Sequence, residues 1–413
     1  MSQQVEPAPR LRPVEGFPVE LDGEPRFVLH DPAGLAEGDI VLTPPAYFIA
    51  TLMDGTRQPQ DIQVQFFKQT GQMLPPAQLA ELISQLVETR YLEGPKFEEH
   101  YQQLSSAYRA GTERRSNDLA GAGLEQDETL SDLFVRMFPG TIEPDPEAPR
   151  IVGLITPHLD YRRGWECYAR VYGRLRGASG IGRFVILGTN HFGRSAAVVA
   201  TDKDFVTPLG TTRVDRGFLT RLAKRCGTDL CACEYDHVRE HSIELQVFAL
   251  QALFGADSFE IVPALCPDPC GPTGTTPITG EGVDLKVFAE HLRDLLAEDP
   301  VRSVVIAAAD LSHVGRRFGD DHDLDPLFLH EVSTRDQKAL IQVREGNPER
   351  FRQIVAEDDN PTRICGVGCI FALLTALPHA EPTLLRYDQT VIKEQDTCVT
   401  CCAFTLTEPT SGS

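Results

Sequence analysis

The chain has 413 residues, of which 41% are hydrophobic and 24% charged, as is typical of a soluble globular protein. This length exceeds that of one ordinary hydrophobic core, so we expect two domains. The net charge of -21 argues against binding to nucleic acids or anionic membranes, which needs positive charge. The sequence has neither a membrane-spanning apolar run nor the pattern of a signal peptide, so a cytoplasmic protein is expected.

The 11 cysteines predict reduced thiols rather than a secreted disulfide framework, because their number is odd and the chain is long. Some lie close together in the sequence: Cys231-x-Cys233, Cys266-x3-Cys270 and Cys398-x2-Cys401-Cys402. A structural zinc site usually needs two such pairs at a suitable spacing. Buried thiols are therefore favoured over a zinc site made of four cysteines.

Residues 13–95 have the pattern of a small α+β domain. Short apolar pieces broken by Gly and Pro predict a hairpin between Pro13 and Leu42. Three helical patterns follow, and the last of them, from Pro75 to Thr89, has an apolar stripe at helical spacing. Tyr91-Leu92 then predicts a short closing strand. A hairpin, three helices and a closing strand make a winged-helix-like module.

This first domain resembles the PqqD-like family, whose small domains bind peptides. The resemblance rests on Asp54-Gly55 ahead of a helix, and on the helix with Leu82 and Leu86 that leads into Arg90-Tyr91-Leu92. It implies a peptide partner, and a winged helix used only for packing is the alternative. DNA binding is disfavoured, because the third helix has no Lys or Arg before its end and a recognition helix needs them.

Residues 96–149 are mostly polar and contain clusters of Gly and Pro, so we expect a linker here. One amphipathic helix is predicted within the linker, from Leu130 to Phe138. The apolar side of this helix is expected to pack on the domain that follows.

Residues 150–407 predict a large α/β domain. Ile151–Ile155 and Phe184–Leu187 are apolar runs too short for buried helices, and they indicate buried strands. Residues 165–176 between them have helical spacing, so the two strands are expected to be parallel. The alternation continues, with strands at 196–200, 259–265, 303–309, 383–387 and 402–406, a hairpin at 204–214, and helices at 217–225, 240–254, 284–297, 333–344, 348–357 and 365–377. We therefore predict a three-layer α/β/α fold with a mainly parallel central sheet.

Polar residues that could bind a metal follow several of the predicted strands. His158 comes after the first strand and His191 after the second. Asp310 and His313 follow the strand at 303–309. The carboxyl ends of parallel strands lie at one edge of a sheet, which is where open α/β sheets bind ligands. These side chains are therefore expected to lie close together.

Two further groups lie at helix starts. His241 and Glu244 are spaced i, i+3, which places both side chains on one face of a helix. Cys365 opens the last main helix, where the helix N-terminus is expected to lower the pKa of the thiol. Histidines, a thiolate and carboxylates are ligands for iron, copper or zinc. The other histidines with charged neighbours are expected on the surface: His237, His322 and His330.

Together these groups resemble the Memo family, in particular the AmmeMemoRadiSam system protein B group. Five motifs carry the resemblance, in the order of the family and across nearly all of the large domain: Pro157-His158-Leu159-Asp160-Tyr161, Leu187-Gly188-Thr189-Asn190-His191, Glu240-His241-Ser242-Ile243-Glu244, Ala309-Asp310-Leu311-Ser312-His313 and Cys365-Gly366. The fold that this resemblance implies is similar to that of the class III (LigB-type) extradiol dioxygenases.

The resemblance implies a metal pocket built from His158, His191 and Cys365, with iron or copper favoured and zinc as the alternative. The candidate catalytic residues around this pocket are His241, Glu244, Asp310 and His313. Extradiol dioxygenases use two histidines and a carboxylate. A thiolate in place of the carboxylate favours copper(I), or redox chemistry at the thiol, over ring cleavage.

The chain departs from the family pattern at three places near the pocket. Asp160 replaces a glycine and adds a carboxylate two residues from His158. Ala308-Ala309 replaces small hydroxyl residues. Cys369 stands where a proline is common, and it adds a second thiol one helical turn beyond Cys365. The carboxylate of Asp160 is therefore a further candidate ligand.

The resemblance also implies partners, namely a radical-SAM enzyme and the protein A component of the same system. A PqqD-like domain fits this context, because such domains present peptides to radical-SAM enzymes. Two other functions are open. One is a non-enzymatic scaffold whose vestigial pocket binds a peptide or a phosphorylated ligand, and the other is a metal-dependent hydrolase with His241 or His313 as general base.

Overall fold

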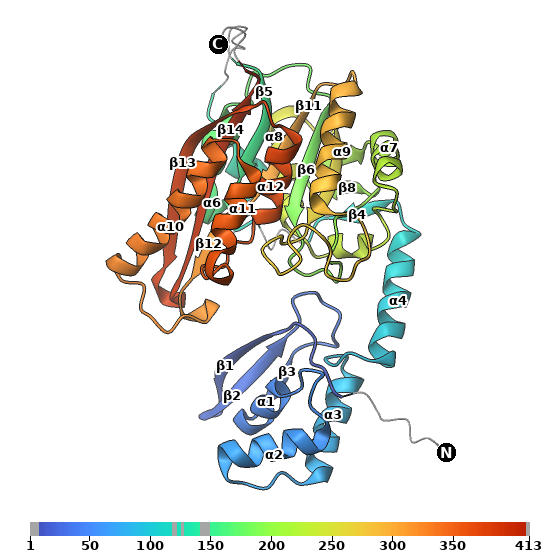
Figure 1. Cartoon of the computed structure of the whole chain (residues 1–413), viewed down its shortest axis with the longest axis vertical. Coiled ribbons are helices and arrows are strands. Elements are labelled where there is room, and N and C mark those ends of the chain that lie inside the picture. Colours follow the sequence, from blue (N-terminus) through green and yellow to red (C-terminus); the bar gives the residue numbers. More distant parts are fainter. Residues whose placement is uncertain (1–7, 118–121, 125–127, 141–148, 410–413) are drawn as a thin grey trace. The chain divides into compact units, whose positions relative to one another are not determined.

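The structure is a computed structural model that describes residues 8–117, 122–124, 128–140 and 149–409. The chain divides into two compact units, Met1–Ala110 and Gly111–Ser413 (Figure 1). Each unit has its own hydrophobic core. Residues 118–121, 125–127 and 141–148 of the expected linker lie outside the described residues. Within the described ranges, no helix is both long and apolar enough to cross a membrane.

The first unit is a three-stranded antiparallel sheet followed by four helices. The strands lie in the order β1 (Glu15–Leu21), β2 (Glu24–His30) and β3 (Ile40–Leu42). The helices are α1 (Pro44–Thr51), α2 (Pro59–Thr70), α3 (Pro76–Glu88) and α4 (Pro95–Arg109). Each helix begins with proline, which suits the first turn because a backbone N–H there has no partner within the helix.

The hairpin between β1 and β2 turns at Asp22-Gly23. Both residues have positive φ, 53° and 75°, as a two-residue type I′ turn requires. The predicted hairpin and the three predicted helices are therefore present in this unit. The closing strand expected at Tyr91-Leu92 is reduced to an isolated bridge between Leu92 and Leu11.

The second unit is built on an 11-stranded sheet. Its central strands are parallel and lie in the order β5 (Ile151–Thr156), β11 (Ser303–Ala308), β6 (Arg183–Thr189) and β10 (Glu260–Cys266). Beside β5 lie the antiparallel strands β14 (Thr397–Thr407), β12 (Asp310–Val314) and β13 (Glu381–Ile392). Beside β10 lie β9 (Gly210–Val214), β8 (Asp204–Thr207), β4 (Glu113–Arg115) and the short β7 (Val199–Ala200).

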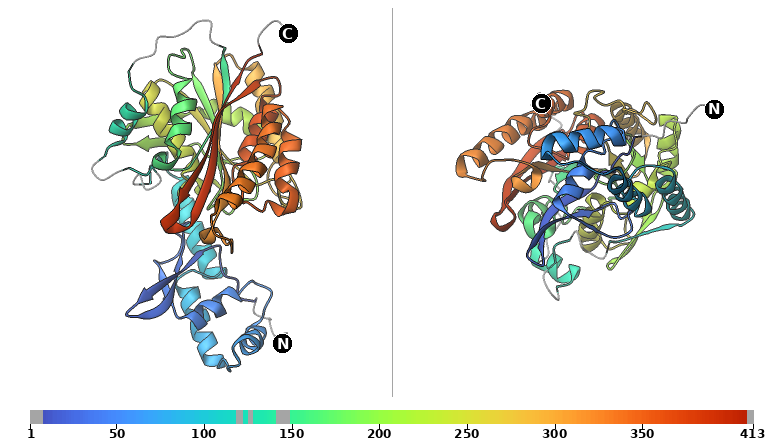
Figure 2. Two further views of the ribbon diagram at one scale, coloured as in Figure 1. Left: turned by 90° about the vertical axis from the view of Figure 1, so that its left-hand side faces the viewer. Right: turned by 90° about the horizontal axis from the view of Figure 1, so that it is seen from below.

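Helices cover both faces of this sheet (Figure 2). One face carries α6 (Tyr161–Gly173) and α8 (Ser242–Phe254), with α5 (Leu130–Met137) packed on α8. The other face carries α9 (Leu285–Glu298) and α12 (Val367–Ala376), with α7 (Arg216–Cys226), α10 (Pro326–Arg344) and α11 (Pro348–Ala356) around them. Every residue of α12 is buried, because this helix fills the centre of its layer. The predicted three-layer α/β/α fold is confirmed.

Three local predictions were wrong. The stretch 96–149 contains α4 and β4 besides the predicted α5. The sequence of α4 has no apolar stripe that predicts a helix, because only Phe97 of this polar segment is buried. Asp310 and His313, for which no strand was predicted beyond 303–309, lie in strand β12, and this strand pairs with β14. The strands β13 and β14 are also longer than predicted. Charged and polar residues interrupt the apolar run of β13, and threonine and cysteine interrupt that of β14, although β14 is buried almost throughout.

Candidate metal centre

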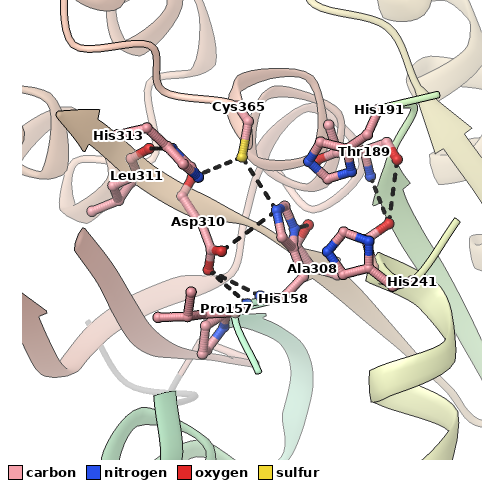
Figure 3. A network of polar contacts seen from close by, with 12 residues as sticks. Pro157, His158, Thr189, His191, His241, Ala308, Asp310, Leu311, His313 and Cys365 are labelled. Carbon is pink, nitrogen blue, oxygen red and sulfur yellow. Dashed lines mark hydrogen bonds and ion pairs between the residues drawn. The ribbon is translucent and has the colours of Figure 1, made fainter. Parts of the chain in front are cut away.

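Three parts of the large unit bring a potential metal ligand to one edge of the sheet. His158 follows β5 and His191 follows β6, and the parallel strand β11 lies between these two strands. Cys365 precedes α12, whose N-terminal residues lie at the same edge. Figure 3 shows the three side chains pointing toward one another. The ligand atoms of His158, His191 and Cys365 all lie within 4.8 Å of one another.

The imidazole of His158 is oriented by the main chain. Its Nδ1 donates a hydrogen bond to the carbonyl oxygen of Ala308, at 2.9 Å, and its Nε2 lies 3.2 Å from the Sγ of Cys365. Burial, together with the neighbouring His191, lowers the pKa of His158 to about 3. The ring is therefore neutral at physiological pH, and the lone pair on Nε2 faces the thiol.

The imidazole of His191 is oriented by a carboxylate instead. Its Nδ1 donates to the Oε1 of Glu240, at 3.1 Å, and Glu240 also accepts the backbone N–H groups of His191 and Ser242. Burial favours neutral His191, but the Glu240 carboxylate outweighs burial and raises the pKa of His191. A histidine that donates from Nδ1 presents Nε2 to a metal.

Glu240 is the supporting residue to which sequence reasoning assigned no role. It is buried, and although burial alone would raise its pKa, His191 and His241 hold the pKa of Glu240 well below the ordinary range. The carboxylate is therefore ionised. Its position directly before His241, in the third motif, is the only sequence signal that could have singled it out.

Asp310 positions the loop that carries His158. Its Oδ1 accepts the backbone N–H groups of His158 (3.0 Å) and Leu159 (3.2 Å), and its Oδ2 lies 3.6 Å from His158 Nε2. Burial raises the pKa of Asp310. The structure thus brings Asp310 into contact with the cluster, and Figure 3 shows Asp310 and His191 on opposite sides of the His158 ring.

His241 and His313 lie on either side of the three potential ligands (Figure 3). The ring of His241 stacks on that of His191, with centroids 5.1 Å apart and planes 18° apart. His313 is held by a hydrogen bond between its Nδ1 and the carbonyl oxygen of Leu311, at 3.0 Å. Burial lowers the pKa of His241 to about 4 and lowers that of His313 as well. Both rings are neutral at physiological pH and able to accept a proton.

Glu244 does not belong to this group of converging side chains. It is buried in an ion pair with Arg114 of β4, and it accepts the backbone N–H of Asn117 at 3.2 Å. Arg114 also donates to the backbone oxygens of Glu240 (2.6 Å) and His237 (3.2 Å). The Arg114–Glu244 pair therefore supports the backbone that carries Glu240.

Two expectations about charge and exposure were wrong. His237 is buried, with Nε2 donating to the carbonyl oxygen of Val199, whereas His322 and His330 are exposed as predicted. Burial and the Asp310 carboxylate raise the pKa of the Cys365 thiol well above its ordinary value, which outweighs the helix N-terminus. A thiol in such a site becomes a thiolate when it binds a cation.

The residues that depart from the family pattern lie at the border of the site. Asp160 caps the N-terminus of α6, where its side chain accepts the backbone N–H of Arg163 and pairs with the Arg163 guanidinium. Its carboxylate is thus occupied by helix capping rather than by the cluster. Cys369 is buried in the first turn of α12, with Sγ 3.6 Å from the hydroxyl of Thr189.

Among the described residues, two groups of side chains have the spacing of metal ligands. One is His158, His191 and Cys365, and the other is His191, Glu240 and His241, which shares His191. All 11 cysteines are free thiols, and no four-cysteine group occurs among these residues. The first group has one soft and two borderline ligands, and its Sγ and Nε2 atoms face one another, whereas the Glu240 carboxylate of the second is already bound to His191 Nδ1.

A family model and several known proteins that match this chain all carry the name Memo. The family model described as "Memo-like protein" matches residues 115–404. A "MEMO1 family protein" of Aquifex aeolicus is 30% identical over 371 residues, which cover 88% of this chain and 91% of that protein. A "MEMO1 family protein" of Thermus thermophilus is 28% identical over 335 residues, covering 81% and 94%. "Protein memo-1 homolog" of Caenorhabditis elegans is 28% identical over 243 residues, covering 57% and 64%.

Proposed function

This chain belongs to the Memo family, and on that premise we propose that it binds one iron or copper ion through His158, His191 and Cys365 and carries out redox or dioxygenase-like chemistry there. One observation carries the proposal. Both imidazoles donate from Nδ1, to Ala308 and to Glu240, so that both Nε2 atoms are left for a metal beside the thiol.

The donor set fits a redox-active metal. Two neutral imidazoles and one thiolate suit copper and iron, and three protein ligands leave positions open for a substrate or oxygen. A closed structural zinc site has four protein ligands, so a site with three is typical of catalysis. The bound metal would supply Lewis-acid or one-electron chemistry. Zinc is the alternative metal, and it would favour a hydrolase.

The surrounding residues have distinct tasks in this proposal. Asp310 holds the backbone that carries His158, and Glu240 orients the ring of His191. His241 and His313 are neutral and partly open to solvent, so they are suited to take a proton from a substrate bound at the open positions. Glu244 is tied to Arg114 and supports this site from within the core.

We further propose that the first unit acts as a PqqD-like peptide-binding domain in the AmmeMemoRadiSam protein B group. Support comes from the motifs at Asp54-Gly55 and Arg90-Tyr91-Leu92 and from the small antiparallel sheet with its helices. The partners proposed are a radical-SAM enzyme and the protein A component of that system. The 11 free thiols support a reducing compartment such as the cytoplasm.

Metal analysis of protein purified without oxygen tests the ligand set. Wild-type protein is expected to contain iron or copper at about one ion per chain, and His158→Ala, His191→Ala and Cys365→Ser are each expected to lose it. The matched control is His322→Ala, because His322 is exposed. Metal retained in all three ligand variants contradicts the assignment.

Two outcomes favour the alternative functions. Stoichiometric zinc together with ester hydrolysis favours the hydrolase. A partner that binds the triple variant, with all three ligands replaced, as well as it binds wild type favours the scaffold.

A further inference from the structure

Cys365 follows a strained piece of backbone. Asp358, Asp359, Asn360 and Arg363 have positive φ values of 58°, 60°, 50° and 56°. They are four of the seven non-glycine residues with positive φ in the part of the chain that the structure describes. Such residues are costly and are concentrated at sites where the surrounding structure imposes the conformation. Their clustering directly before a metal ligand therefore points to a function of this segment.

The side chain of Asn360 closes the segment onto the residue that precedes the thiol. Its Oδ1 accepts the backbone N–H of Ile364 at 2.9 Å, and its Nδ2 donates to the carbonyl oxygen of Ile364 at 3.0 Å. Only a side-chain amide offers a donor and an acceptor in this arrangement. Ile364 is itself buried, so both hydrogen bonds fix backbone groups that have little access to water.

Strand β12 holds the segment on both sides of the thiol. Before it, the carbonyl oxygen of Thr362 accepts the backbone N–H of His313 at 2.7 Å, and Arg363 Nε donates to the carbonyl oxygen of His313 at 2.9 Å. After it, the backbone N–H of Gly366 donates to the carbonyl oxygen of Asp310 at 3.2 Å. Between these anchors, the side chain of Asn360 makes hydrogen bonds to the backbone of Ile364, the residue that leads into the thiol.

We propose that Asn360 is a positioning residue for the thiol ligand. Its amide holds both backbone groups of Ile364 and thereby keeps the Sγ of Cys365 at 3.2 Å from His158 Nε2. The proposal rests on the proposed function, because it takes Cys365 as a ligand. A preorganised ligand binds metal more tightly than one that must be ordered during binding.

Cobalt(II) titration of the purified full-length chain tests this role, because thiolate ligation gives cobalt a charge-transfer band. Wild type is expected to show the band and Cys365→Ser to lack it. Asn360→Gly keeps a residue that tolerates positive φ but removes both hydrogen bonds, and it is expected to bind cobalt about 10- to 100-fold more weakly. Asp359→Gly makes the same replacement at the neighbouring position, φ 60°, and is expected to keep wild-type affinity.

The melting temperature of the metal-free variants separates positioning from general stability. A merely structural Asn360 lowers the melting temperature and leaves the cobalt affinity of the folded protein unchanged, which overturns the proposal. Equal losses of affinity in Asn360→Gly and Asp359→Gly overturn it as well, since the backbone and not the amide is then responsible. If Asn360→Gly does not fold, Asn360→Asp keeps the acceptor but not the donor and carries the same expectation of weakened binding.

The failures of the two proposals are distinguishable. A wild-type chain that gives no thiolate band with cobalt overturns the ligand set, and the role of Asn360 with it. A wild-type chain that gives the band, beside an Asn360→Gly variant of equal affinity, overturns only the role of Asn360.

Discussion

The three proposed ligands reach the cluster from two kinds of structure. His158 and His191 stand at the ends of strands β5 and β6, which belong to the regular parallel part of the sheet. Cys365 follows an irregular segment with several left-handed residues. A histidine ring can be aimed by one hydrogen bond at Nδ1, which leaves Nε2 for a metal, whereas a short thiol can be aimed only through its backbone. Regular structure therefore suffices for the histidines, and local strain is concentrated before the cysteine.

The largest effect is expected on stability, at the buried Arg114–Glu244 pair, which supports the backbone that carries Glu240. Arg114→Leu leaves Glu244 charged and buried, and the free energy of unfolding is expected to fall by about 3–5 kcal/mol in urea denaturation. Arg114 and Glu244 are each only 2% exposed in their side chains, whereas the matched control Arg115→Leu changes a side chain that is 76% exposed. The double variant Arg114→Leu/Glu244→Leu is expected to recover much of the loss. Equal stability of Arg114→Leu and Arg115→Leu would contradict this expectation.

A smaller loss of stability is expected at Gly366, the residue that follows Cys365. Gly366→Ala places a Cβ atom 2.4 Å from the Cβ of Ala309 and 2.7 Å from the carbonyl oxygen of Asp310, so the start of α12 must move. Destabilisation by about 1–3 kcal/mol is expected, with weakened metal binding because Cys365 moves too. Gly173→Ala is the matched control, since nothing lies within 4 Å of its added Cβ. Thermal unfolding and metal content measure both effects, and a Gly366→Ala variant that behaves like Gly173→Ala speaks against tight packing here.

Glu240→Gln tests whether Glu240 orients the ring of His191, and it leaves all three proposed ligands in place. The amide keeps the size of the side chain but weakens the bond to His191 Nδ1, so metal affinity is expected to fall about 10- to 100-fold. Metal titration against a competing chelator measures this change. Glu234→Gln alters another buried glutamate, bound to Lys203 and Thr201, and serves as the control for loss of a buried charge. Unchanged affinity in Glu240→Gln would mean that the ring of His191 is aimed by something else.

The smallest effect is expected at Asp160. Asp160→Ala removes the N-terminal cap of α6 and is expected to cost about 1 kcal/mol of stability, while metal content stays at the wild-type level. Thermal unfolding and elemental analysis of the same preparation test both parts. Loss of metal in this variant would show that the carboxylate takes part in the site after all.

The histidine side of the site could be predicted from the sequence, and the reasons are local. Short apolar runs before His158 and His191 identify buried strands, and parallel strands bring their carboxyl ends to one edge. The layers of the fold follow from the same alternation. Helix α4 could not be recognised by this pattern, because a helix with one buried residue has almost no apolar periodicity.

What remained hidden depends on contacts between distant parts of the chain. Glu240 contacts the ring of His191 across 49 positions, and Arg114 reaches Glu244 across 130. Neither pairing leaves a periodic trace in the sequence. The raised pKa of Cys365 was hidden for a related reason, since burial by surrounding elements outweighs the local effect of the helix terminus that the sequence does reveal.

The hydrogen bond from His158 to Ala308 differs from its counterpart at His191 in how it responds to mutation. Every residue has a carbonyl oxygen, so no single substitution at position 308 can delete this acceptor. The acceptor for His191 is a side chain, and one codon change at Glu240 removes or neutralises it. Natural variation can therefore adjust the basicity of the His191 imidazole while the acceptor for His158 stays constant. Of the two proposed histidine ligands, one is thus tunable and the other is not.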